Sequence, residues 1–388
     1  MQRSPASPPS QHNKHKYTAA ACALVVLAAF GAETLRWTRA APAPSALSMA
    51  AAAGGQARLT DMTQSLIPMP PDTPSAHAST LATVPGGMLA FWWAGSRESG
   101  PDVKVYASRS TNGKWSAPWE VASRESLGKM LGFGVRRIGN PVTWTALDGK
   151  VHLYVVATGL GGWAASRVVH MVSQDAGVHF EVRRVLPLSP LFNTSVLVRS
   201  SPVGLADGGW WLPVYFELGI KYPMLMAFDG DGEPARLGRI GERMSTLQPA
   251  IVPMSGTEVR AWMRDASDEQ RVQHALSRDG GASWEDLPAL DLPNHSTSLA
   301  AIRLASGELL MLHNHVVPGG SSRSILRLSI SKDGHAWRTV DDIASGKAGD
   351  EFSYPTMHQV GDQLHITYTH QRQAIAYRAY RIQTGESI

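Results

Sequence analysis

One pattern of apolar and polar positions recurs six times after residue 74: an apolar strand, a glycine-containing turn and a second apolar strand. The turns are marked by Gly87, Gly149, Gly208, Gly256, Gly307 and Gly361, at intervals of 48 to 62 residues. Each interval leaves room for two further strands, and no segment after residue 60 shows a long helical period. The pattern therefore predicts an all-β fold, a six-bladed β-propeller of four-stranded blades over residues 74–388. An ordinary β-sandwich would not explain six similarly spaced units.

A second repeat has the form Ser-x-Asp-x-Gly-x-x-aromatic. It runs from Ser277 to Trp284 and from Ser173 to Phe180, with shortened forms starting at Ser331 and Ser110. The Asp or Asn closes a turn on nearby backbone N–H groups, the Gly permits a positive φ, and the aromatic ring pins the turn to its blade. Each copy falls between the predicted third and fourth strands of its repeat. We therefore interpret the motif as structural and its Asp residues as non-catalytic.

The N-terminal segment is predicted to be a targeting signal. A polar stretch ends in Lys14, His15 and Lys16, an apolar core follows over residues 17–35, and Arg36 and Arg39 close it. This order is typical of a secretory signal peptide or of a membrane anchor over residues 1–39. Small residues at 40–46 suit cleavage, and an Ala/Pro/Gly-rich linker is predicted over 40–73. Both cleavage and retention stay open, and both place the remaining chain outside the cytoplasm.

Charge and cysteine content narrow the function classes. The formal net charge of +4 lies entirely within residues 1–40, so the other 348 residues balance. A body without excess positive charge has no counterions to release, which argues against nucleic-acid binding. Cys22 is the only cysteine, which excludes an internal disulfide and a cysteine-based metal cluster. No cofactor and no metal are expected.

The boxes, set in a six-unit array, resemble the Asp-box (BNR) turns of the sialidase (neuraminidase) superfamily over about residues 74–385. The resemblance implies a sialidase-like propeller that binds a glycan. It also implies an arginine triad for the substrate carboxylate, an Asp as acid/base, and a Tyr nucleophile assisted by a Glu. A guanidinium fork matches a carboxylate in two parallel hydrogen bonds. A phenol is a poor nucleophile unless a neighbouring carboxylate takes its proton, which makes sialidases an exception among glycosidases.

Carried over position by position, the resemblance assigns roles to five residues. Arg264 and Arg323 stand where the second and third triad arginines do, and Tyr354 stands at the nucleophile position. Arg97 matches the arginine that closes the first hairpin, and Asp102 lies in the loop that brings the acid/base. Structural roles for the same residues, such as ion pairs between blades, are the alternative.

The sequence departs from the pattern at two positions. His77 lies where the first triad arginine is expected, and Gln248 lies where the assisting glutamate is expected. A glutamine cannot take a proton, so Glu217, which ends the third hairpin, is the substitute candidate. Asn314, at the end of the fifth hairpin, completes the substrate-binding candidates.

These residues predict an exported sialidase-like glycoside hydrolase that acts on an acidic sugar, sialic acid or a uronic acid, of a glycan or exopolysaccharide. Two alternatives remain open: a non-catalytic glycan-binding propeller, and a uronate lyase or unusual hydrolase that uses His77 as base or acid. A retained N-terminal segment would add a membrane contact. The oligomeric state is not predicted.

Overall fold

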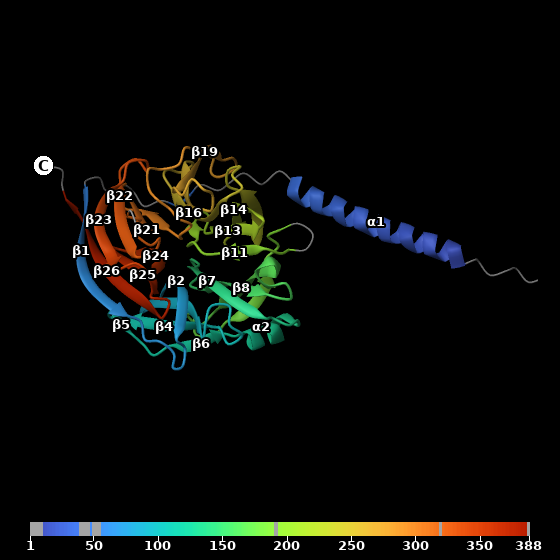
Figure 1. The fold of residues 1–388 in the computed structure, drawn as a ribbon, viewed down its shortest axis with the longest axis horizontal. Coiled ribbons are helices and arrows are strands. Elements are labelled where there is room, and N and C mark those ends of the chain that lie inside the picture. Colours follow the sequence, from blue (N-terminus) through green and yellow to red (C-terminus); the bar gives the residue numbers. More distant parts are fainter. Residues whose placement is uncertain (1–10, 39–46, 49–55, 190–192, 318–319, 386–388) are drawn as a thin grey trace, which may run out of the picture.

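The computed structural model describes residues 11–38, 47–48, 56–189, 193–317 and 320–385. The described residues form six antiparallel sheets, which Figure 1 shows arranged as the blades of one body. The first blade comprises β2 (Ser75–Val84), β3 (Gly87–Gly95), β4 (Lys104–Thr111), β5 (Lys114–Trp115) and β6 (Trp119–Ala122). The second blade comprises β7 (Arg137–Thr145), β8 (Val151–Thr158), β9 (Ser166–Ser173) and β10 (Glu181–Val185).

Blades three and four have the same antiparallel order. The third blade comprises β11 (Val196–Val198), β12 (Val203–Gly204), β13 (Trp210–Leu218), β14 (Ile220–Phe228) and β15 (Pro234–Arg239). The fourth blade comprises β16 (Thr246–Pro253), β17 (Val259–Asp265), β18 (Gln273–Ser277) and β19 (Glu285–Leu287). The fifth blade comprises β20 (Ala300–Arg303), β21 (Leu309–Asn314), β22 (Ile325–Ser331) and β23 (Arg338–Ser345).

The sixth blade contains both ends of the propeller. Its strands are β24 (Phe352–Val360), β25 (Gln363–His370), β26 (Ala374–Gly385) and, as the outermost strand, β1 (Gln56–Leu66). Figure 1 shows blue β1 alongside red β26, and the two pair antiparallel from Gln56–Gly385 to Leu66–Ala376, with a register shift between Asp61 and Thr63. The prediction of six blades is therefore confirmed. Five of the six marker glycines lie in the turns between first and second strands, and Gly87 is the first residue of β3.

The linker predicted over 40–73 is wrong in its second half, because β1 lies there. Most side chains of β1 are exposed, as expected for an outer strand paired on one side, so it shows no apolar alternation. Residues 40–46, where cleavage is predicted, and 49–55 lie outside the described residues. Two short helices, α2 (Arg124–Leu131) and η1 (Gly162–Ala165), interrupt the strands.

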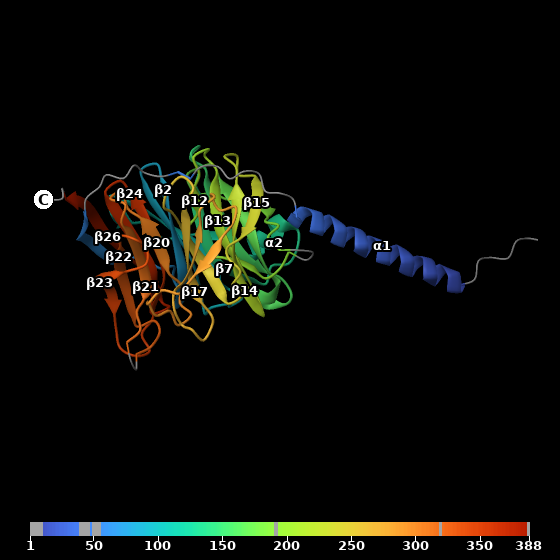
Figure 2. The ribbon, with the colours of Figure 1, turned by 90° about the horizontal axis from the view of Figure 1, so that it is seen from above.

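The N-terminal helix α1 (Gln11–Thr38) is separate from the sheets in Figures 1 and 2. Its described side chains, over residues 16–32, are exposed. Within the described part of the chain, no helix is long and apolar enough to cross a membrane.

The inner strands of neighbouring blades contact one another around the ring: β2 meets both β7 and β24, and β16 meets β20. Several inner strands share a local irregularity. A residue with positive φ sits at a register shift at Ala78 (58°), Gln248 (53°) and Tyr354 (53°). Such bulges re-aim side chains at the end of a strand. The functional candidates in β2, β16 and β24 lie at these points.

The Ser-x-Asp turns lie between the third and fourth strands, as predicted. In the copy that follows β18, Asp279 accepts hydrogen bonds from the hydroxyl of Ser277 and from the backbone and hydroxyl of Ser283. Trp284 is only partly buried, against the core shared by the third and fourth blades. The Asp side chains are therefore used within the turns.

Candidate functional site

A cavity of about 240 Å³ lies at the bulged ends of the inner strands. It draws residues from the first, second, third, fourth and sixth blades. Its lining consists of Glu98, Asn140, Trp163, Leu197, Tyr215, Glu217, Gln248, Arg264 and Tyr354. Four predicted site residues are thus brought together: Tyr354, Arg264, Glu217 and Gln248.

Tyr354 and Arg264 are in direct contact. The Arg264 guanidinium donates from Nη1 to the Tyr354 hydroxyl at 3.4 Å, and from Nε and Nη2 to the Ser296 hydroxyl at 3.2 and 3.1 Å. Among the described residues, no carboxylate lies within ion-pair distance of Arg264. Its positive charge at the cavity wall is therefore not neutralised locally.

Two further guanidinium groups lie against the Tyr354 ring. The Cζ atoms of Arg199 and Arg323 are 5.2 and 5.7 Å from its centroid. Arg199 is buried and donates to the carbonyl oxygen of Pro355 at 2.7 Å and to the Thr356 hydroxyl at 3.2 Å. Burial lowers the pKa of Arg199 to about 10, which leaves it charged at neutral pH. Tyr354 is therefore surrounded by positive charge.

Arg323 is joined to a fourth arginine through one carboxylate. Glu351 accepts from Arg323 Nη1 on Oε1 and from Arg372 Nε on Oε2, both at 2.7 Å. Burial alone would raise the pKa of Glu351, but a hydrogen bond from Ser353 and the charges of Arg323 and Arg372 bring it below its ordinary value. Arg372 also forms an ion pair with Glu98, which lines the cavity.

His77 lies beneath Tyr354 rather than in the cavity. Its ring centroid is 4.0 Å from that of Tyr354, and it is 1% exposed. Burial, followed by the charges of Arg372, Arg323, Arg199 and Arg264, lowers the pKa of His77 well below its ordinary value. Neither ring nitrogen has a hydrogen-bond partner within the described structure. His77 is therefore a buried side chain that packs against Tyr354 and does not line the cavity.

The positions of Gln248 and Glu217 bear on which group could take a proton. The buried Gln248 donates from Nε2 to the Tyr215 hydroxyl at 3.3 Å. Tyr215 is itself buried, and burial raises its pKa. Glu217 lies two residues after Tyr215 on β13, so both side chains are on the same side of the strand. Glu217 is the carboxylate that the third blade presents to the cavity.

Five predicted site residues do not line the cavity: Arg323 and His77, described above, and Arg97, Asp102 and Asn314. Arg97 is exposed on the loop after β3. Asp102 accepts from the backbone and hydroxyl of Ser96 at 2.7 and 2.8 Å, which lowers its pKa and holds it within its own loop. Asn314 is buried and donates to the carbonyl oxygens of Ile325 and Phe352, so it links the fifth blade to the sixth. Strand-end position alone did not distinguish these residues from those that face the cavity.

The structure adds residues that the sequence did not single out: Arg199, Tyr215, Glu351 and Arg372. A signal was present for Arg199, because a charged residue directly follows the wholly buried strand β11. Arg372 lies in the turn between β25 and β26, and its carbonyl oxygen accepts from the Ala76 N–H at 2.8 Å. Its proximity to the first blade depends on ring closure.

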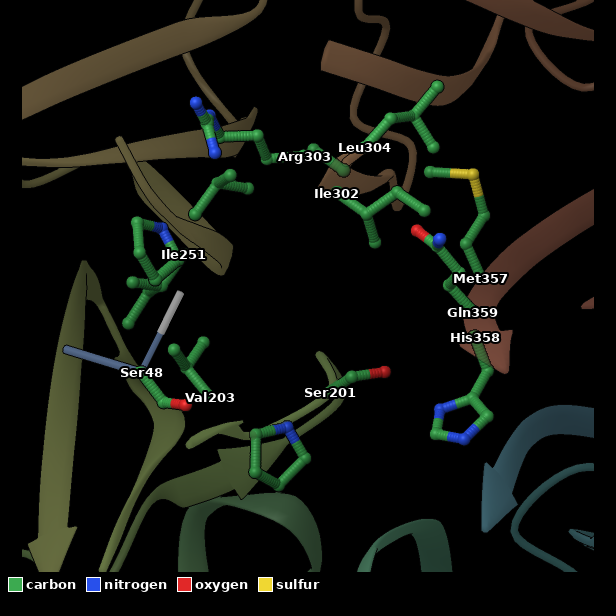
Figure 3. A pocket seen from close by; sticks show the side chains of 14 residues that line it. Ser48, Ser201, Val203, Ile251, Ile302, Arg303, Leu304, Met357, His358 and Gln359 are labelled. Carbon is green, nitrogen blue, oxygen red and sulfur yellow. The ribbon is translucent and has the colours of Figure 1, made fainter. Parts of the chain in front are cut away.

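A second cavity of similar volume lies at the opposite ends of the inner strands. Figure 3 shows Ser201, Ile251, Ile302 and Met357 around it, together with Ser48 of the N-terminal segment. It is lined mainly by apolar side chains and strand backbone. The cation cluster and Tyr354 belong to the first cavity, which is therefore the candidate site.

Solved structures share this fold at low sequence identity. The Hadza microbial sialidase Hz136 aligns with a TM-score of 0.66 and 15% identity, covering 80% of this chain and 66% of that one. A protein of unknown function from Dyadobacter fermentans aligns with a TM-score of 0.65 and 15% identity, covering 84% and 99%. Trypanosoma rangeli sialidase in complex with sialic acid aligns with a TM-score of 0.61 and 16% identity, covering 86% and 60%. The chain thus spans about two thirds or less of the length of these two sialidases.

Sequence comparison gives a family. No curated protein matches the chain significantly. The BNR repeat-like domain matches residues 86–366, which is most of the propeller and includes every Ser-x-Asp turn. Because this match covers more than half of the chain, the chain belongs to the BNR repeat-like family, and it shares its propeller fold with sialidases.

Proposed function

We propose that the protein is a glycoside hydrolase that removes an acidic sugar from the end of a glycan. The observation that carries this proposal is the guanidinium of Arg264, which faces the cavity and bonds only to hydroxyl groups there. A substrate carboxylate would form charge-assisted hydrogen bonds with it. The Trypanosoma rangeli sialidase, whose fold this chain shares, is described in complex with sialic acid.

The remaining cavity residues support a double displacement. In the first step, the Tyr354 oxygen would attack the anomeric carbon while Glu217 takes the phenol proton and the glycosidic bond breaks. The surrounding guanidinium groups favour the negative charge that develops on the phenol oxygen. In the second step, water would displace Tyr354 from the sugar, and the phenol would recover its proton.

The size of the cavity favours a terminal sugar. At about 240 Å³ it is smaller than the pockets of roughly 300–1,000 Å³ that enclose drug-sized ligands. One sugar ring suits this space better than an internal segment of polysaccharide. Sialic acid and uronic acids both carry the carboxylate that Arg264 requires.

Binding measurements with a charge-conserving variant test the carboxylate contact. Wild type is titrated with sialic acid, glucuronic acid and a neutral sugar, alongside Arg264→Lys and Arg323→Lys. We expect the two variants to lose about ten- to a hundredfold in affinity for the acidic sugar, because a lysine cannot reproduce the planar fork.

The control is Arg327→Lys, because Arg327 pairs with Asp342 and does not line the cavity. Thermal unfolding is recorded for every variant. Equal wild-type affinity for acidic and neutral sugars, or full binding by Arg264→Lys, would contradict the proposal.

A glycan-binding propeller without activity is the second candidate. It is favoured by Gln248, which offers no carboxylate at the position where the family resemblance implies the assisting glutamate. Turnover of aryl glycosides by wild type separates binding from hydrolysis. The lyase alternative loses support, because His77 is buried and does not line the cavity.

We further propose that the N-terminal segment exports the propeller. The support is its order of charged, apolar and small residues. A reporter fused after residue 55 should be active only outside the cytoplasm, and the mass of the purified protein should reveal whether the segment is cut. Cytoplasmic activity of the reporter would refute export.

A further inference from the structure

We propose that Glu98 is the acid/base of this site, and that Arg372 holds it until an anionic sugar takes its place. This inference rests on the hydrolase proposal above and assigns a role that the sequence gave to Asp102. The first observation is where the two carboxylates lie. Glu98 lines the cavity, whereas Asp102 is retained by Ser96 in its own loop outside the lining.

The contact between Glu98 and Arg372 is of a kind that opens readily. Their side chains are 49% and 37% exposed, and ion pairs exposed to this degree contribute little to stability. The other partner of Arg372 behaves differently. Glu351 is 18% exposed and accepts from both Arg323 and Arg372, so it stays in place. When the two ion pairs of Arg372 compete with a ligand, the bond to Glu98 is the one to yield.

The charges around Arg372 explain why a substrate carboxylate would replace the carboxylate of Glu98 as its partner. Arg199, Arg264 and Arg323 all contact Tyr354, and Arg372 is joined to Arg323 through Glu351. A substrate carboxylate drawn to this cluster competes with the carboxylate of Glu98 for Arg372. Glu98 is then released next to the sugar. Without its cation and covered by substrate, a carboxyl group favours its neutral form and takes a proton from water.

With Glu98 as the acid/base, every proton that moves in the reaction has a donor and an acceptor. Neutral Glu98 gives its proton to the glycosidic oxygen as the bond from that oxygen to the anomeric carbon breaks, and the Tyr354 oxygen bonds to the carbon. Glu217 holds the phenol proton. Glu98 then accepts a proton from the water that attacks the anomeric carbon, the bond to Tyr354 breaks, and Glu217 returns its proton to the phenol oxygen.

Leaving-group dependence tests the acid. Wild type and Glu98→Gln are compared on a nitrophenyl and an alkyl glycoside of the same acidic sugar, because only the alkyl leaving group needs a proton. We expect Glu98→Gln to lower kcat/KM about 10²- to 10⁴-fold on the alkyl glycoside and much less on the nitrophenyl glycoside. Asp102→Asn and Glu120→Gln serve as comparisons, since Glu120 is an ion-paired carboxylate on the same blade outside the cavity. Equal losses on both substrates, or a selective loss in Asp102→Asn, would overturn the assignment.

Proton uptake tests the exchange without relying on catalysis. Calorimetric titration with sialic acid and glucuronic acid, in buffers of different ionisation enthalpy, reports protons bound with the ligand. We expect wild type to take up a proton and Glu98→Gln to take up none; Arg372→Gln should take up less than wild type, because its Glu98 has no cation to lose when the ligand binds. Uptake that persists in Glu98→Gln, or is absent in wild type, would overturn the proposal. A wild type that binds acidic sugars and cleaves no glycoside would refute the hydrolase proposal alone. Proton uptake would still test whether the ligand replaces Glu98 at Arg372.

Discussion

Tyr354 lies among groups that can stabilise charge, and only Glu217 and Glu98 among the cavity-lining residues can accept a proton as carboxylates. The two proposed roles differ in what they predict. We expect Glu217→Gln to lower kcat about 10²- to 10⁴-fold on both nitrophenyl and alkyl glycosides, because Glu217 serves the nucleophile and not the leaving group. Steady-state rates on the two substrates check this.

Glu242→Gln is a suitable control, since Glu242 is 89% exposed and is not among the residues that line the cavity. A Glu217→Gln variant that keeps its activity while Gln248→Glu gains activity would move the proton acceptor to position 248. That result would restore the arrangement implied by the family resemblance.

At the scale of elements, the Asp-box turns stabilise the blades less than the sequence alone suggests. A fully buried tryptophan would make Trp284→Ala cost about 3–5 kcal/mol. Because Trp284 is partly buried, we expect a loss of about 2 kcal/mol in unfolding free energy. Denaturant unfolding measures it, and an unchanged midpoint would show that the ring adds nothing to the blade.

Two buried histidines make the second blade sensitive to acid. His152 and His170, on β8 and β9, share a hydrogen bond of 2.8 Å between Nδ1 and Nε2. Burial is the main cause that lowers the pKa of His152 from 6.5 to about 4 and that of His170 to about 2. The nearby charges are Arg183, Arg184, Lys150, Asp148 and Glu233.

The sign of the pH effect follows from these shifts. The unfolded chain binds protons at these histidines below pH 6.5 and the folded chain does not, so stability falls as the pH drops from 6.5 towards 4. The expected slope is at most about 1.4 kcal/mol per pH unit for each histidine. Urea unfolding of wild type and of a His152→Gln, His170→Gln double variant at pH 7 and pH 5 checks it. A double variant with the same pH dependence as wild type would assign the effect to other groups.

For the whole molecule, the structure predicts which N-terminal truncation is tolerated. Removing residues 1–55 leaves every strand of the propeller in place. Removing residues 1–66 deletes β1 and leaves β26 as an unpaired edge, which invites association between chains. We expect the first variant to be folded and monodisperse and the second to melt earlier and aggregate. Thermal unfolding and size-exclusion chromatography distinguish them, and equal behaviour would mean that β1 is dispensable.

The sequence predicts best those features of the fold that depend on a local pattern of residues. The six hairpins and the Ser-x-Asp turns are local, and they were predicted correctly. β1 was missed because its mostly exposed side chains show no alternation. Arg264, Tyr354, Glu217 and Gln248 were placed through a family resemblance and do meet at one cavity. Arg372 was not, because a residue in an ordinary hairpin turn comes near Glu98 only after the first and last blades meet.

The pairing of β1 with β26 also determines when the propeller ring can close during folding. The first strand of the propeller pairs with residues 376–385, so it stays unpaired at the ribosome until the intervening five blades have been synthesised. Contacts of such long sequence separation form slowly and late. The ring is therefore sealed only after residues 374–385 have been synthesised, and a chain interrupted shortly before residue 374 would display the exposed edges of an open ring.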